Sequence, residues 1–152
     1  MNDFRIRPKD NFIHEATWTQ LYALTEHWKS DMQFYKGDLN FLHHLIDKYF
    51  LYLSKKENID LVLEMEVNLL QVEKQCNVLI EQINKHFHHL AELIDDPFTY
   101  VSDTFRTEHE QLEADLSLFV KDFRKNRKEI FAITEHMIEG EEWIKQLHVL
   151  QG

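Results

Sequence analysis

Apolar residues recur every three or four positions over almost the whole chain. The first such row runs from Trp18 to Leu53, the second from Val62 to Leu90 and the third from Val101 to Met137. This spacing keeps the side chains on one side of an α-helix, where they can pack against other helices. A half-buried strand would need apolar residues at every second position instead. The chain is therefore predicted to be all-α, an antiparallel bundle of three long helices with coiled-coil-like packing.

Polar breaks set the expected limits of the helices. We expect a single domain, 1–152, with an N-terminal arm over 1–15, long helices over 16–54, 58–95 and 100–138, and a short C-terminal helix over 141–150. Pro97 disfavours helix in the residue before it and ends the second long helix. Gly140 marks the expected stop or kink before the short helix. Because the connections are short, consecutive helices should pack antiparallel.

The third row shows which positions are expected in the core of the last long helix. They are Val101, Phe105, His109, Leu112, Leu116, Phe119, Phe123, Ile130, Ile133 and Met137.

Charge and composition exclude several classes of function. A formal net charge of −10 argues against binding nucleic acid or an anionic membrane, because both require an excess of Lys and Arg. We interpret the one basic cluster, 121–128 (KDFRKNRK), as a solvated helix face. We find no membrane-spanning stretch and no secretory signal, which predicts a cytoplasmic protein. Cys76, the single cysteine, is expected to be a buried apolar residue.

The first helix carries more apolar residues than one row requires. Leu24, Phe34, Phe41 and Leu45 form a second stripe beside the first. The terminal segments could cover this stripe, or it could be buried against a second subunit or another protein. We favour a homo-oligomer, because large exposed apolar patches mark association surfaces.

One stretch has a familiar pattern. The segment 28–39 (WKSDMQFYKGDL) contains a Trp, then Phe-aromatic-Lys, then an acidic-aliphatic pair. It resembles the corresponding part of a group of small uncharacterised bacterial helical proteins. The resemblance implies an all-helical fold and carries no activity, cofactor or partner.

His86 and His109 stand where an apolar row normally carries Leu, Ile or Val. In antiparallel helices joined by short turns, residues at one height have numbers with a constant sum, roughly 195 for the second and third helices. His86 is therefore expected to lie level with His109. A sum of roughly 112 for the first two helices adds His27 to this layer. His27 stands beside the first row, on the stripe of Leu24 and Phe34, so it could also face away from the other two histidines.

Carboxylates accompany these histidines. Asp31 follows His27 by four residues and Glu113 follows His109 by four, so each pair shares a helix face. Imidazoles and carboxylates on facing helices are how bundles hold Fe, Mn or Zn. The five residues His27, His86, His109, Asp31 and Glu113 are therefore the candidate metal ligands. The same layer could instead be a hydrogen-bonded polar contact that fixes helix register, or a cluster that responds to pH.

Other polar groups have simpler interpretations. Glu73 is expected to pair with Lys36, whereas His43, His44, His88 and His89 are expected at the surface or rim, without a partner from another helix.

No complete catalytic set is found, so we expect a protein that is not an enzyme and needs no cofactor. The leading hypothesis is a non-catalytic interaction and oligomerisation module. The alternatives are a metal-binding bundle and a binder of small apolar ligands.

Overall fold

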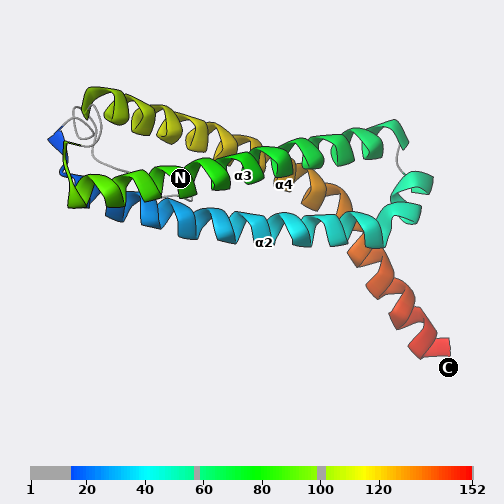
Figure 1. Cartoon of the computed structure of the whole chain (residues 1–152). Helices are drawn as coiled ribbons and strands as arrows, with labels where there is room; N and C mark the ends of the chain where they lie inside the picture. The colour runs from blue at the N-terminus through cyan, green and yellow to red at the C-terminus, as the bar shows by residue number, and fades with distance from the viewer. Residues whose placement is uncertain (1–14, 57–58, 99–101, 152) are drawn as a thin grey trace.

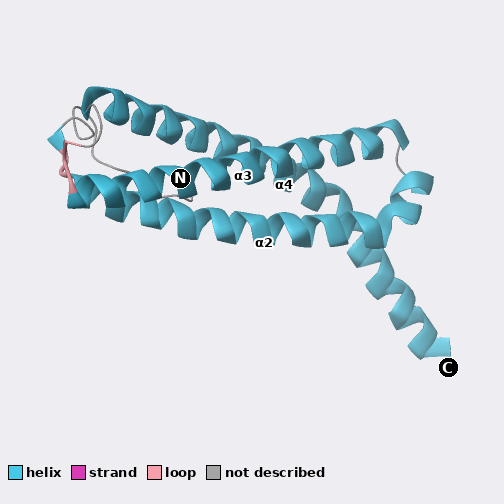
Figure 2. Ribbon diagram, in the orientation of Figure 1, coloured by secondary structure: helices cyan, strands magenta, loops and turns pink. Residues whose placement is uncertain are grey.

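The computed structural model describes residues 15–56, 59–98 and 102–151, and side chains over 15–50, 59–98 and 103–135. Three long helices make up nearly all of this: α2 (Trp18–Lys56), α3 (Ile59–Asp95) and α4 (Ser102–Gln151). Figure 2 shows the helices packed together, and the described ranges contain no strand. The prediction of an all-helical bundle is therefore confirmed. The predicted N-terminal arm lies almost wholly outside the described residues.

Local hydrogen bonds determine where α2 begins. The backbone N–H of Gln20 donates to Oγ1 of Thr17 over 3.1 Å, and the backbone N–H of Thr17 donates to Oε1 of Gln20 over 2.9 Å. This reciprocal capping box satisfies two of the N–H groups that lack partners at the start of a helix. The Arg106 side chain of α4 joins this end to the bundle, because it donates to the carbonyl oxygen of Ala16 over 2.8 Å and lies over the ring of Trp18.

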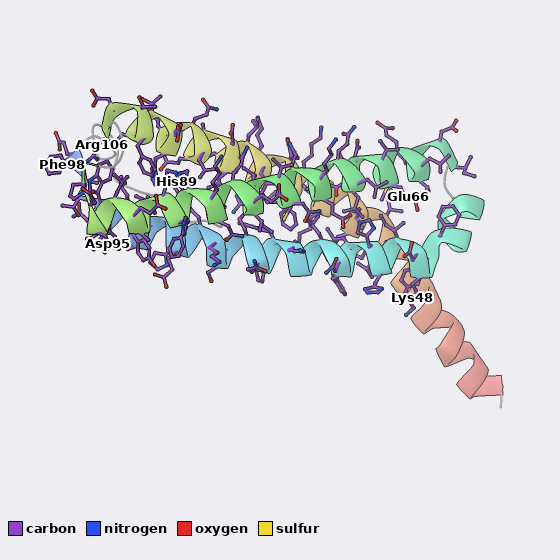
Figure 3. All side chains as sticks on the ribbon, in the orientation of Figure 1. Lys48, Glu66, His89, Asp95, Phe98 and Arg106 are labelled. Carbon is purple, nitrogen blue, oxygen red and sulfur yellow. The ribbon has the colours of Figure 1, made fainter. Side chains whose placement is uncertain are left out.

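The helices run alongside one another in sequence order. Figure 1 shows α3 beginning at the end of the bundle where α2 ends, and α4 beginning at the end where α3 ends. In Figure 3, Lys48 of α2 and Glu66 of α3 lie at one end, and Asp95 of α3 and Arg106 of α4 lie at the other.

The separate short helix predicted over 141–150 is wrong. α4 is one helix of 50 residues that passes through Gly140 without interruption. Figure 1 shows its last part extending past the ends of α2 and α3. A glycine inside a helix costs only about 0.5–1 kcal/mol relative to alanine. Neither a proline nor another strong breaker follows Gly140, so the helix continues across it.

The apolar rows form the core. Every member of the second row, Val62 to Leu90, is buried, and so is the first row from Leu21 to Tyr49. In α4 the row continues through Asn126 and Thr134, which the sequence interpretation did not include; Ile133, which it did include, is only half-buried. The spacing of three and four residues thus persists through α4, but polar side chains occupy two of its later positions.

The two buried threonine hydroxyls of this core are satisfied within their own helices. Oγ1 of Thr25 donates to the carbonyl oxygen of Leu21, and Oγ1 of Thr134 donates to that of Ile130, each over 2.8 Å. Threonine can therefore replace an apolar residue here at little cost in unpaired polar atoms.

Candidate functional site

The structure brings the two histidines of the apolar rows together. Nε2 of His86 on α3 lies 2.6 Å from Nδ1 of His109 on α4. The side chains are 6% and 0% exposed, so the pair is fully inside the core. The predicted equal height of these two residues is confirmed.

A second contact farther along α3 and α4 follows the same register. Nε2 of Gln75 donates to Oδ2 of Asp122 over 3.3 Å. The residue numbers of Gln75 and Asp122 add up to nearly the same total as those of His86 and His109, so both contacts fit one alignment of α3 with α4. Helices of equal rise keep this relationship over several turns, which is why the sequence could predict the histidine pair.

Aromatic rings enclose the pair on both sides. The Phe105 ring stacks on His86 with centroids 4.5 Å apart and an interplanar angle of 8°. The Trp28 ring stacks on His109 with centroids 4.7 Å apart and an angle of 27°. The order Phe105, His86, His109, Trp28 therefore joins all three helices in one layer of rings. This arrangement keeps water away from the imidazoles.

Burial changes the acid–base behaviour of the pair. It lowers the pKa of His86 from 6.5 to about 4, with a smaller contribution from the positive charge of His89. His86 is therefore neutral at pH 7, and one of the two imidazoles donates the shared hydrogen while the other accepts it. If both imidazoles became cations, both facing nitrogens would be donors and the hydrogen bond would be lost.

The third predicted histidine lies apart from this pair. His27 is exposed, whereas its neighbour Trp28 is buried and stacks on His109. Successive residues of a helix differ in direction by about 100°, so only one of these two neighbours can face the core. The place that the sequence suggested for His27 is therefore occupied by Trp28.

The two predicted carboxylates are half-buried. Asp31 and Glu113 both lie at the edge of the core. Oδ2 of Asp31 is inaccessible to solvent and has no hydrogen-bond partner among the described residues, and the same holds for Nε1 of Trp28, one turn earlier on α2. These two polar atoms accompany the histidine layer at a cost in free energy, because buried polar groups are normally paired.

The described residues do not fit a metal centre as they are arranged. Within these ranges, no group of three or more His, Cys, Asp or Glu side chains is placed to hold an ion. Two nitrogens bound tetrahedrally to one zinc ion would be about 3.3 Å apart, given Zn–N distances of about 2.0 Å. His86 and His109 are closer than this, at 2.6 Å, and share a hydrogen bond instead.

The other polar groups include one correction. Glu73 pairs with His43, not with Lys36 as predicted: Oε2 of Glu73 lies 2.5 Å from Nε2 of His43. His43 thus has a partner on another helix, which the sequence interpretation did not expect. His88 pairs with Glu92 one turn later, over 3.2 Å, and is exposed as predicted.

Asn126 is the buried polar residue that sequence reasoning missed. It is 3% exposed, and neither Oδ1 nor Nδ2 has a hydrogen-bond partner among the described residues. The signal for it was its spacing, three residues after Phe123 and four before Ile130. Asn126 lines a groove of about 690 Å³ between α3 and α4, the α3–α4 groove. Its walls include Asn68, Gln71, Lys74, Gln75, Val78, Gln82, Asp115, Leu118, Asp122, Lys125 and Glu129.

The surface carries more exposed apolar side chains than the predicted stripe. Within that stripe, Phe34 and Phe41 are 68% and 49% exposed, whereas Leu24 and Leu45 are half-buried against the core. A further row on α3 was not predicted: Ile59, Leu63, Val67, Leu70 and Val78, each between 44% and 56% exposed. We name this row the outer row of α3. In the described part of the chain, no helix has a stretch long and apolar enough to cross a membrane.

Comparison with models of protein families, with curated proteins and with solved structures finds no match to this chain. The case for a function therefore depends on the geometry of its own residues.

Proposed function

We propose that the chain is an antiparallel, coiled-coil-like helical bundle that acts as a non-catalytic interaction and oligomerisation module. The outer row of α3 carries this proposal. Its five residues fall within about 100° of arc on the helix, on the side away from the buried row. A helix that is apolar on two opposite faces is expected to be covered on both.

The predicted stripe of α2 adds to this surface in part. Phe34 and Phe41 are seven residues apart and so lie on one face of α2. Phe41 lies beside Phe131 of α4, with ring centroids 6.3 Å apart. Leu24 and Leu45 already contribute to the core of their own chain, which leaves the two phenylalanines available to a partner.

Self-association is the simplest form of such an interaction, because two copies can bury the same patch on each other about a two-fold axis. Sedimentation velocity or light scattering, from low to high micromolar protein, tests it. We expect an oligomer, and we expect Leu63→Ser with Leu70→Ser to lower its average mass. Asn77→Ser on α3 is the matched control, because Asn77 is exposed and polar already. A wild-type chain that stays monomeric at every concentration would contradict self-association.

A metal-binding bundle is the second proposal, and the two imidazoles that α3 and α4 bring together favour it. Coordination by His27, His86, His109, Asp31 and Glu113 would require His27 to move inward and the His86–His109 hydrogen bond to break. Elemental analysis of protein purified without a histidine tag tests this. About one equivalent of Fe, Mn or Zn, with thermal stabilisation by the same metal, would support it. Less than about a tenth of an equivalent, without stabilisation, would exclude it.

A further inference from the structure

Within the described residues of the chain, no other helix runs beside the last part of α4 (Figure 1). α4 has 50 residues, whereas α2 and α3 have 39 and 37. Figure 1 shows its C-terminal part running beyond the other two helices. Most helices in proteins are stabilised by packing against other elements and not by helix propensity alone. A second molecule would supply this packing for residues 136–151.

The sequence of α4 is charged in two blocks of opposite sign. The basic block, 121–128 (KDFRKNRK), is followed by an acidic block of equal length, 135–142 (EHMIEGEE). The basic block has five Lys or Arg and one Asp, and the acidic block has four Glu and no Lys or Arg. The two blocks are symmetric about position 131.5, next to Ala132. A second α4 that runs in the opposite direction about this point would therefore place its acidic block beside the basic block of the first.

Charged residues from both blocks lie on one face of α4, together with Ala132. Lys121, Lys125 and Lys128 are exposed, as is Ala132. Lys125 is seven residues before Ala132, and Glu139 is seven residues after it. Steps of seven residues return to nearly the same side of a helix. When a second α4 lies antiparallel with the two Ala132 residues opposite each other, Lys125 of one copy is level with Glu139 of the other.

A parallel pairing in register would be unfavourable by the same logic. It would place the basic block beside a basic block and the acidic block beside an acidic one, and like charges at this distance repel. Only the antiparallel pairing makes the charges complementary, and it closes about a two-fold axis. The small side chain of Ala132 also allows the two helix backbones to approach closely where they cross.

The same pairing supplies an occupant for the α3–α4 groove. With Ala132 at the centre, residues 136–151 of one copy run back along residues 113–128 of the other. This span includes most of the α4 wall of the groove, with Leu118 at its rim and Asn126 in its floor. Leu118 is 57% exposed and Val78, on the opposite wall, is 44% exposed. A helix laid in the groove would cover both and complete a four-helix arrangement.

We propose that two copies of this chain associate through antiparallel α4 helices that cross at Ala132, and that residues 136–151 of each copy occupy the α3–α4 groove of the other. This proposal rests on the self-association proposed above and adds α4 and the α3–α4 groove to the interface. Of the outer row of α3, only Val78 lines that groove.

A disulfide at the two-fold axis tests the geometry directly. In full-length Ala132→Cys protein, the two new thiols lie opposite each other and should form an intermolecular disulfide under mild oxidation. Cys76 does not compete, because it is fully buried and burial raises its pKa to about 11. Ser117→Cys is the matched control, since it is also exposed on α4 but lies 15 residues from Ala132. In the proposed pairing its two thiols would be about 45 Å apart along the helix axis, too far to form a disulfide. We expect the cross-linked fraction of Ala132→Cys to exceed that of the control by about tenfold or more; equal fractions would overturn the proposal.

Charge reversal provides an independent test. One variant replaces Lys121, Lys125 and Lys128 by Glu, and the other replaces Glu135, Glu139 and Glu142 by Lys. Each alone should raise the dimer dissociation constant about tenfold or more, and mixing the two variants should restore association as a heterodimer.

The control for these variants makes the same charge change elsewhere. Reversal at the exposed lysines Lys29, Lys36 and Lys85, all outside α4, should leave the dissociation constant within about twofold of wild type. A monomeric wild-type chain would overturn both self-association and this α4 pairing. A wild-type oligomer that neither cross-links at Ala132→Cys nor responds to the reversals would overturn the α4 pairing alone.

Discussion

The imidazole of His86 on α3 and that of His109 on α4 share a hydrogen bond of 2.6 Å inside the core, between the rings of Phe105 and Trp28. A shift of α3 against α4 by one turn would leave both rings buried without this bond. Unpaired buried polar groups cost about 1–3 kcal/mol each. The pair therefore favours one register of the two helices over its neighbours, as single polar residues do in coiled coils.

Stability should fall in mild acid because of His86. Its pKa is 6.5 in the unfolded chain and about 4 in the folded one, so between these values the unfolded state binds the proton more readily. The contribution is fully present above pH 6.5 and is lost as the pH falls toward 4. The loss is about 3 kcal/mol, at about 1.4 kcal/mol for each unit of pKa difference. Urea unfolding at a series of pH values measures it.

The carboxylates of the chain also change the free energy of unfolding in acid. The test therefore compares the pH dependence of this free energy between wild type and variants. His86→Gln should reduce the slope of unfolding free energy against pH between 6.5 and 4. Asn84→Gln, two residues earlier on α3, exposed and without a titratable group, should leave the slope unchanged. Equal slopes for wild type and His86→Gln would show that His86 does not titrate as its burial predicts.

Removing both members of the pair should cost less than the two single changes together. His86→Leu leaves His109 facing an apolar group, and His109→Leu does the same to His86, so each should cost about 1–3 kcal/mol. The double variant leaves neither imidazole unpaired, and the coupling energy should be about 1 kcal/mol or more. For comparison, His43→Ala and Glu73→Ala break a half-exposed pair, whose coupling should be below about 1 kcal/mol. Additive effects at His86 and His109 would mean that their contact contributes nothing to stability.

Asn126→Leu should stabilise the fold. The amide of Asn126 is buried with no hydrogen-bond partner among the described residues, and leucine has the same branched shape and number of side-chain heavy atoms without the polar groups. We expect a gain of about 1–3 kcal/mol in the free energy of unfolding. Asn77→Leu on the exposed surface of α3 should change it by less than about 0.5 kcal/mol. A loss of stability in Asn126→Leu would indicate that the amide has a partner in solution.

Gly37→Ala should also stabilise the protein, for a different reason. Gly37 is exposed inside α2, and a Cβ added there would meet no atom within 4 Å. Alanine restricts the unfolded chain and adds no strain, which is worth about 0.5–1 kcal/mol in a helix. The change should appear as a higher denaturation midpoint with an unchanged slope against denaturant. A lower midpoint would mean that the surface around Gly37 is covered in solution.

The equal height of His86 and His109 was predictable because it depends on few quantities. The rise per residue is the same in every α-helix, and the connection between α3 and α4 is short. The core positions of α3 were predictable for a related reason, since a row of one spacing selects one face of a helix. In α4 the same spacing places Asn126 at a core position, but its polar amide did not suggest a buried residue.

The repeat of apolar residues was enough to establish that this chain forms long packed helices and that two histidines meet between them, because helix geometry is local and nearly constant. It was not enough to establish which residues flank that pair. Trp28 belongs to the first apolar row and so was expected in the core, but the stacking of its ring on His109 depends on how α2 packs against α4. The rotation of α2 about its own axis also decides how the second stripe is covered, because it buries part of Leu24 and Leu45 and exposes Phe34 and Phe41. Such rotations depend on how whole helices pack against one another, so they follow from the three-dimensional arrangement and not from the spacing of residues along the chain.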